Sequence, residues 1–128
     1  MRLLLDTCTF LWFTQDRTSL SDIARDALTD MDNVVFMSAV TAWEISIKYR
    51  RGRLPLPLPP AQFLQDRRVR YGFKPLAVDE NAAFHAATLP VIHKDPFDRM
   101  LVCQAMQESL TLVTPDPNIR KYAVNTLW

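Results

Sequence analysis

Short apolar runs recur along the chain and predict its strands. Leu3–Leu5 and Val34–Met37 are continuous apolar stretches, which is typical of strands buried on both faces. Leu110–Thr114 predicts another strand, Leu76–Val78 a short one, and Val124–Trp128 an edge strand. These runs supply the strands of the expected sheet.

The segments between these strands carry helical periodicity and helix-boundary signals. Ser21 and Asp79 have the side chains that N-caps prefer. Asp95 followed by Pro96 is typical of a helix start, and Gly52 can end a helix in the left-handed conformation. Helices are predicted over Thr7–Gln15, Ser21–Asp30, Thr41–Arg51, Pro60–Tyr71, Asp79–Leu89 and Asp95–Glu108, with a turn or short helix at Asp116–Tyr122.

Strands and helices alternate along the chain, which favours an α/β fold with a mainly parallel central sheet and helices on both faces. The length of 128 residues and the 48% of apolar residues suit one domain with a real core, so we expect residues 1–128 to form a single domain. Sheets of this kind bind ligands beyond the carboxyl ends of their strands, where the strand order reverses.

Four acidic residues follow strands or open helices. Asp6 directly follows the first strand, and Asp116 follows the Leu110–Thr114 strand after one proline. Glu44 and Asp98 fall in the first turns of two predicted helices. The carboxyl ends of parallel strands and the N-termini of the following helices lie on the same edge of such a sheet. We therefore expect these carboxylates to converge on one rim.

Asp98 gives the sharpest local argument. The apolar stripe of its helix consists of Leu101, Val102, Ala105 and Met106. Asp98 lies in the middle of that stripe, and a carboxylate that points at a core costs several kcal/mol unless it is paired or binds a metal. The alternative is a capping box, in which Asp95 is the cap and Asp98 reaches back to it.

The other three acids have structural alternatives as well. Glu44 could be the second half of a capping box with Thr41, and it could pair with Lys48 one helical turn later. Asp6 could be a turn former, and Asp116, between two prolines, could be a turn residue. The functional interpretation therefore depends on all four acids lying together at one edge.

Carboxylates gathered at one place repel one another, raise each other's pKa values and destabilise the fold. A divalent cation removes that penalty, and oxygen ligands without histidine or cysteine point to Mg²⁺ or Mn²⁺ rather than zinc. Such a site suits phosphoryl chemistry, because the cation polarises a phosphate oxygen and lowers the pKa of a bound water.

Composition narrows the function classes further. The two glycines, Gly52 and Gly72, cannot form a glycine-rich phosphate cradle. The formal net charge of +1 gives no overall attraction to nucleic acid, but basic residues gather at Lys48–Arg53 and Arg67–Arg70. These clusters are either solvated helix faces or contacts for a phosphate backbone, and the sequence leaves both interpretations open.

Several other side chains carry weaker expectations. His93 is expected as a surface-loop histidine, although a general-base role is conceivable, and the three tryptophans are expected in the core rather than as a base-stacking platform. Cys8 and Cys103 are expected as free thiols. The apolar run Leu3–Leu5 is too short for a signal peptide, so we expect a cytoplasmic protein without a membrane segment.

The sequence resembles PIN-domain ribonucleases, specifically the VapC-type toxins of prokaryotic toxin–antitoxin pairs. The matching pieces are Leu3–Cys8 with Leu11 and Trp12, Ser38–Ile45, His93–Leu101, Leu112–Asp116, and the terminal Leu127 and Trp128. Each piece is weak alone, but together they span essentially the whole chain in the right order and spacing. As a set, they are specific.

The resemblance implies a PIN-like α/β/α sandwich and an Mg²⁺- or Mn²⁺-dependent endoribonuclease. The family's acidic metal-site positions fall on Asp6, Glu44, Asp98 and Asp116. The hydroxyl residue that the family often uses near the last acid is Thr114, and Asp95 is expected as a structural N-cap that could also support the site. The resemblance also implies an RNA substrate, a homodimer and a cognate antitoxin whose tail enters the active-site groove.

We therefore expect a metal-dependent endoribonuclease in which Asp6, Glu44 and Asp98 hold the catalytic cation. Asp116 would support it or hold a second one, and a metal-activated water would attack the phosphodiester in line. A receiver domain would need an acidic pair after the first strand and a lysine after a late strand, and the sequence has neither. A haloacid-dehalogenase-like phosphatase would need an acid where Cys8 stands. The alternative from another class is a non-catalytic binding module whose acids are only caps.

Overall fold

The computed structural model describes residues 1–128, and its centre is a sheet of five parallel strands. The strands are β1 (Arg2–Leu5), β2 (Val34–Ser38), β3 (Lys74–Leu76), β4 (Thr111–Val113) and β5 (Thr126–Leu127). They lie in the order β3-β2-β1-β4-β5. Leu4 of β1 pairs with Phe36 of β2 on one side and with Leu112 of β4 on the other. The predicted α/β fold with a parallel sheet is confirmed.

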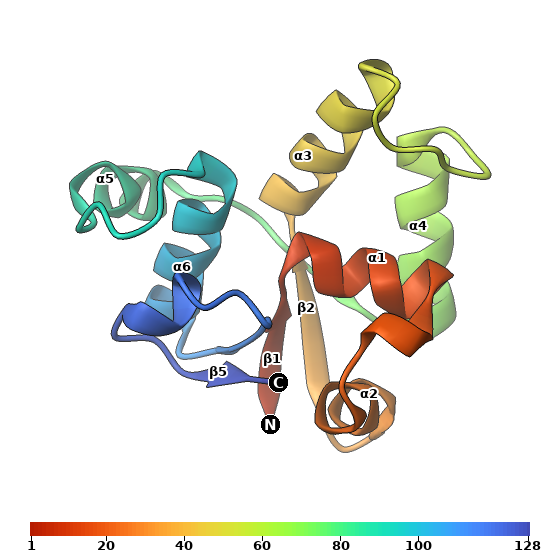
Figure 1. Cartoon of the computed structure of the whole chain (residues 1–128), viewed down its shortest axis with the longest axis horizontal. Helices are drawn as coiled ribbons and strands as arrows, with labels where there is room; N and C mark the ends of the chain where they lie inside the picture. The colour runs from red at the N-terminus through yellow and green to blue at the C-terminus, as the bar shows by residue number, and fades with distance from the viewer.

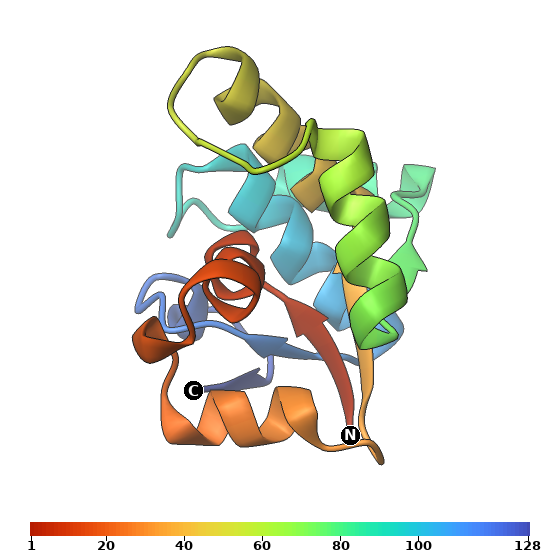
Figure 2. The ribbon, with the colours of Figure 1, turned by 90° about the vertical axis from the view of Figure 1, so that its right-hand side faces the viewer.

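Helices cover both faces of this sheet. They are α1 (Thr7–Gln15), α2 (Asp22–Thr29), α3 (Ala39–Arg50), α4 (Pro60–Tyr71), α5 (Glu80–Thr88) and α6 (Pro96–Glu108), with the 3₁₀ turns η1 (Arg17–Ser19) and η2 (Ile119–Lys121). In Figure 1, α1, α2 and α4 lie to the right of β1 and β2, whereas α5 and α6 lie to the left. Figure 2 views the side that α1, α2 and α4 cover. No helix has the length and hydrophobicity needed to cross a bilayer.

The side chains of β1 show how the two faces are built. Leu3 and Leu5 pack in one apolar cluster with Phe10 of α1. Leu4, which points the opposite way, packs in a second cluster with Leu101 of α6. All of these residues are 0% exposed. Because successive side chains of a strand point to opposite faces, this alternation gives the predicted three-layer α/β/α sandwich.

The start of α3 differs from the sequence prediction. The helix begins at Ala39 rather than Thr41, because Ser38 at the end of β2 is its N-cap. The Ser38 hydroxyl oxygen accepts a 3.0 Å hydrogen bond from the N–H of Val40. Thr41 therefore lies inside the helix, where its hydroxyl bonds that of Thr7 at 3.0 Å.

The strand β3 also differs from its predicted position. The sequence predicted Leu76–Val78, but the strand is Lys74–Leu76, which pairs in register with Phe36–Ser38 of β2. Strand pairing thus selects a segment that contains Pro75, and its place at the edge of the sheet tolerates the missing N–H donor. The predicted edge strand at the C-terminus is present as the shorter β5.

The strand order reverses between β1 and β4. From β1 the chain adds β2 and β3 on one side, and it then returns to add β4 and β5 on the other. Asp6 directly follows β1, and Thr114 directly follows β4. The carboxyl ends of these two strands therefore meet at the reversal, which is where open α/β sheets bind ligands.

Candidate active site

A cavity of about 260 Å³ lies at this reversal. Its acidic lining consists of Asp6, Glu44, Asp95, Asp98 and Asp116. These side chains come from the end of β1, from α3, from the start of α6 and from the loop after β4. The structure thus brings together all of the acids that the sequence predicted at one rim.

Asp6 occupies the N-cap position of α1, but its side chain makes no capping hydrogen bond. Its Oδ2 instead accepts a 2.6 Å hydrogen bond from the Thr114 hydroxyl and a 3.3 Å bond from the Cys8 thiol. Asp6 is 4% exposed and Thr114 is 0% exposed. The carboxylate is therefore held by side chains at the wall of the cavity and is not used to cap the helix.

Glu44 is buried on α3, with 4% of its surface exposed. Its Oε2 forms a 2.5 Å ion pair with Lys48, one helical turn later, as the sequence indicated. Its Oε1 is buried and has no hydrogen-bond partner. The capping-box alternative for Glu44 is wrong, because the helix is capped by Ser38 and Thr41 lies in its interior.

Asp95 caps α6, as predicted. Its Oδ1 accepts hydrogen bonds from the N–H groups of Phe97 and Asp98, at 2.8 Å and 3.3 Å. A capping box would also need the Asp98 carboxylate to accept the N–H of Asp95, but that N–H donates to Nδ1 of His93 at 3.1 Å. The capping-box alternative for Asp98 is therefore wrong. The carboxylate of Asp98 turns instead towards His93, whose Nε2 lies 3.0 Å from its Oδ2.

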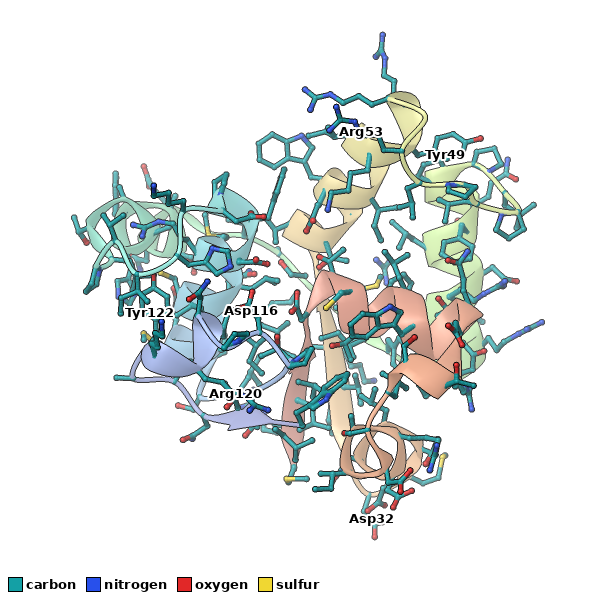
Figure 3. The ribbon with its side chains drawn as sticks, viewed as in Figure 1. Asp32, Tyr49, Arg53, Asp116, Arg120 and Tyr122 are labelled. Atoms are coloured by element: carbon teal, nitrogen blue, oxygen red, sulfur yellow. The ribbon has the colours of Figure 1, made fainter.

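Asp116 both shapes a turn and faces the site. Its N–H donates to the Thr114 hydroxyl at 3.1 Å, and its Oδ1 accepts from the N–H of Asn118 at 2.8 Å. Its Oδ2 lies 2.9 Å from Nε2 of His93. Figure 3 shows Asp116 near the centre of the molecule, between α6 and α1. The predicted turn role is therefore correct, and the second carboxylate oxygen faces His93 and the site.

His93 is the site residue that the sequence interpretation missed. The side chain was expected in a surface loop, but it is only 15% exposed, and its Nε2 contacts the carboxylates of Asp98 and Asp116. The expectation was wrong because the loop residues that directly precede α6 lie at the same rim of the sheet as the N-terminus of that helix. The position of His93, two residues before the cap Asp95, was the available signal.

Burial raises the pKa values of two acids in the cavity. Desolvation raises the pKa of Asp6 above its ordinary value, although the hydrogen bond from Thr114 opposes this rise. Desolvation, followed by the charges of Asp6 and Asp95, raises the pKa of Asp98 to about 7. A cation among these carboxylates would favour their ionised forms and so lower both pKa values.

Asp116 and Cys8 complete the electrostatics of the site. Desolvation favours the neutral carboxyl of Asp116, but hydrogen bonds from His93 and from the N–H of Asn118 outweigh it and lower its pKa. Burial and the neighbouring charge of Asp6 raise the pKa of the Cys8 thiol. Cys8 therefore stays a neutral donor to Asp6, and the anionic groups that line the cavity are carboxylates. Cys8 and Cys103 are both free, as predicted.

The donor set fits a hard divalent cation. A carboxylate oxygen that is buried without a hydrogen-bond partner, as Glu44 Oε1 is, is costly and calls for a ligand. Carboxylates from several elements face the same cavity. Oxygen ligands of this kind suit Mg²⁺ and Mn²⁺. Asp6, Glu44, Asp98 and Asp116 line the cavity and could hold the ion, and the ligand atoms of Asp98, Asp116 and His93 all lie within 4.8 Å of one another.

The basic clusters contribute less to the cavity than the acids do. Of their members, only Lys48 lines the cavity. Arg67 lies over the ring of Phe63, 4.7 Å from its centroid, and forms an ion pair with Asp66. Figure 3 shows Arg53 at the far end of α3, well away from Asp116. Lys48 is therefore the member of these clusters that places a basic side chain at the cavity.

The tryptophans do not all lie in the core, as the sequence had suggested. Trp12 and Trp128 pack against each other, with ring centroids 5.8 Å apart, beside the cluster that contains Phe10. Trp43 is 62% exposed and meets Phe97 edge to face at 5.2 Å. The core prediction is therefore wrong for Trp43, which lines a separate apolar cavity of about 300 Å³.

The chain is also similar to known proteins in sequence. The sequence model of the PIN domain family matches residues 3–125. Ribonuclease VapC16 of Mycobacterium tuberculosis is 44% identical over 61 residues, which are 48% of this chain and 43% of that protein. The match thus spans less than half the length of this curated relative.

Two solved structures share the fold. VapBC2 from Rickettsia felis, bound to a DNA fragment from its promoter, has a TM-score of 0.72 and 15% identity, over 98% of this chain and 97% of that one. VapBC-5 from Mycobacterium tuberculosis, of the VapBC family of toxin–antitoxin systems, has a TM-score of 0.59 and 20% identity, over 98% and 94%. Because the family match covers almost the entire sequence and the fold agrees with it, this chain belongs to the PIN domain family.

Proposed function

We propose that residues 1–128 form a single PIN-like nuclease domain, a metal-dependent endoribonuclease that is the toxin component of a toxin–antitoxin pair. The observation that carries this proposal is the convergence of buried and half-buried carboxylates on one cavity, where Glu44 Oε1 has no hydrogen-bond partner within the protein. The name of the relative VapC16, a ribonuclease, supports the same activity.

Each side chain has a distinct part in this proposal. Asp6, Glu44 and Asp98 hold the catalytic Mg²⁺ or Mn²⁺, and Asp116 supports it or holds a second ion. When bound, such a cation polarises a phosphate oxygen and lowers the pKa of a bound water, which prepares hydrolysis of the RNA backbone. Thr114 orients the Asp6 carboxylate by its 2.6 Å hydrogen bond.

Lys48 and Asp95 have supporting parts. Lys48 is paired with Glu44, and this bond raises its pKa against the opposing effect of desolvation, so it carries a positive charge at the cavity. That charge is available to a phosphate of the substrate. Asp95 fixes the first turn of α6 and so sets the direction of the Asp98 side chain.

The alternatives fit the site less well. The position where a phosphatase of the haloacid-dehalogenase type would carry its second acid is Cys8, a neutral thiol that donates to Asp6. A binding module whose acids are only caps is disfavoured, because the carboxylates of Asp6 and Glu44 make no capping bond to a backbone N–H.

The proposal includes RNA as substrate, a cognate antitoxin, a homodimer and a cytoplasmic location. The structural relative VapBC-5 comes from a toxin–antitoxin system, which supports an antitoxin for this chain. Trp43 and Phe84 are 62% and 65% exposed, so apolar surface is available for contacts with another chain. The mass of the purified protein in solution tests the homodimer directly.

A cleavage assay tests the activity. The purified protein should cut single-stranded RNA with Mg²⁺ or Mn²⁺, lose cleavage in EDTA and regain it when metal is restored. Asp98→Asn should lower cleavage at least 100-fold, in the range typical of an electrostatic contribution to catalysis. Asp32→Asn is the matched control, since Asp32 lies far from Asp116 in Figure 3. Full activity of Asp98→Asn would overturn the site assignment.

A further inference from the structure

His93 stands between two carboxylates of the site. Its Nε2 lies 3.0 Å from Oδ2 of Asp98 and 2.9 Å from Oδ2 of Asp116. The same nitrogen forms a hydrogen bond with Asp116 and a close contact with Asp98, whose carboxylate has no hydrogen-bond partner. One imidazole nitrogen therefore joins an acid on α6 to an acid on the loop after β4.

The backbone determines which nitrogen of His93 carries the proton. The N–H of Asp95 donates a 3.1 Å hydrogen bond to Nδ1. A backbone N–H is always a donor, so Nδ1 must present its lone pair, and the proton of the neutral ring is on Nε2. Nε2–H thus donates a hydrogen bond to the carboxylate of Asp116 and lies in close contact with that of Asp98.

The backbone of His93 is itself firmly held. The hydroxyl of Tyr122, a residue that is 6% exposed, accepts hydrogen bonds from the N–H groups of Ile92 and His93 and donates to the carbonyl of Pro90. Arg99 donates to the carbonyl of His93 at 3.3 Å and to that of Pro90 at 3.0 Å. The ring is therefore placed by the loop before α6 and does not swing freely.

We propose that His93 is a positioning residue that holds Asp98 and Asp116 at a fixed separation for the cation without binding the ion itself. The proposal rests on the proposed function, because it concerns the same metal site. Direct coordination through Nε2 would require the proton to move to Nδ1, where it would face the N–H of Asp95. Hydrogen bonds that orient the ligands of a metal commonly change its affinity about 10- to 100-fold.

The first experiment measures Mn²⁺ binding to the full chain by titration calorimetry. His93→Ala should bind Mn²⁺ about 10- to 100-fold more weakly than the wild type. His93→Gln, which keeps an N–H donor at the end of the side chain, should recover most of that loss. His85→Ala is the matched control, because His85 is exposed on α5 and should bind as the wild type does.

The second experiment separates positioning from coordination. Pulsed electron paramagnetic resonance of the Mn²⁺-loaded wild type should reveal no directly coordinated nitrogen. In the metal-free protein, the ¹⁵N shifts of His93 should assign the proton to Nε2. A directly coordinated nitrogen that disappears in His93→Ala would overturn the proposal, and so would unchanged Mn²⁺ affinity in that variant.

The outcomes also distinguish this inference from the proposed function. Wild-type protein that binds Mn²⁺ through this site but does not cut RNA overturns the nuclease activity and leaves the role of His93 supported. Wild-type protein that binds no Mn²⁺ overturns both. Equal Mn²⁺ binding by the wild type and by His93→Ala overturns only the inference.

Discussion

The hydroxyl of Thr114 donates a 2.6 Å hydrogen bond to Oδ2 of Asp6 and so links the ends of β4 and β1 across 108 positions of sequence. The same hydroxyl oxygen accepts the N–H of Asp116. One buried side chain therefore sets the position of the first acid and of the loop that carries the last one. This link fixes the Asp6 carboxylate and the loop that carries Asp116 relative to each other, at the point where the strand order reverses.

Thr114→Val removes this link but keeps the shape of the side chain. The Asp6 carboxylate loses a donor and the N–H of Asp116 loses its acceptor, so the free energy of unfolding should fall by about 1–3 kcal/mol. Mn²⁺ should also bind more weakly. Urea denaturation and calorimetry measure the two effects. Thr114→Ser, which keeps the hydroxyl, is the control, and equal behaviour of the two variants would contradict the role given to the hydroxyl.

The sequence was sufficient to predict the fold and the acids of the site. Apolar strands such as Leu3–Leu5 alternate with capped helices, and parallel strands place their carboxyl ends at one edge. That rule alone predicted that Asp6, Asp98 and the other two acids would meet. The prediction did not depend on the exact start of α3, which the cap Ser38 shifts by two residues.

The features that escaped prediction depend on contacts distant in sequence. The burial of His93 follows from Tyr122, a residue 29 positions away, whose hydroxyl accepts its N–H. Trp43 is 62% exposed on α3, and its aromatic contact is with Phe97 of α6, a residue distant in sequence. Local periodicity contains no information on either packing arrangement.

Asp98→Asn should stabilise the metal-free protein and abolish its response to metal. Burial and neighbouring acids raise the pKa of Asp98 to about 7, so its ionised form weakens the fold at pH 8. In EDTA at pH 8, the variant should melt about 4 °C higher, which corresponds to about 1 kcal/mol in a domain of this size. Mn²⁺ should raise the melting temperature of the wild type only. A variant that melts lower than the wild type in EDTA would contradict this assignment.

The metal-free protein should lose stability as the pH rises from about 4 to about 8. Because the pKa of Asp98 is raised to about 7 in the folded state, the folded chain holds more protons than the unfolded chain in this range. The contribution of Asp98 to stability is complete at pH values below its pKa in the unfolded chain and is lost as the pH rises through its pKa in the folded chain. Asp6, whose pKa is also raised, acts in the same direction, whereas Asp116, whose pKa is lowered, acts in the opposite direction at low pH.

Calorimetric melts in EDTA across this pH range measure that loss. The slope of stability against pH should be shallower in Asp98→Asn than in the wild type. Binding of Mn²⁺ displaces the proton, so the metal-induced rise in melting temperature should be larger at pH 8 than at pH 6. Identical slopes in the two proteins would exclude Asp98 as the group that titrates.

Arg99→Lys should weaken the loop that places His93. The two terminal nitrogens of Arg99 donate to the carbonyls of Ala86, Leu89, Pro90 and His93. A lysine cannot reproduce this planar fan of donors, so stability should fall by about 2 kcal/mol and Mn²⁺ affinity should fall with it. Arg120→Lys is the control, because Arg120 is exposed. Denaturation and Mn²⁺ titration measure the stability and the Mn²⁺ affinity of both variants. Equal stability and equal affinity of Arg99→Lys and Arg120→Lys would contradict the role given to Arg99.

The position of the bound ion is the most direct measurement. In a crystal of the wild-type protein grown with Mn²⁺, anomalous scattering locates the metal independently of activity. We predict a strong peak among the carboxylates of Asp6, Glu44 and Asp98, and no such peak in crystals of Asp98→Asn. A peak elsewhere in the molecule, or no peak in a protein that cuts RNA with Mn²⁺, would contradict the proposal that these carboxylates hold the catalytic cation.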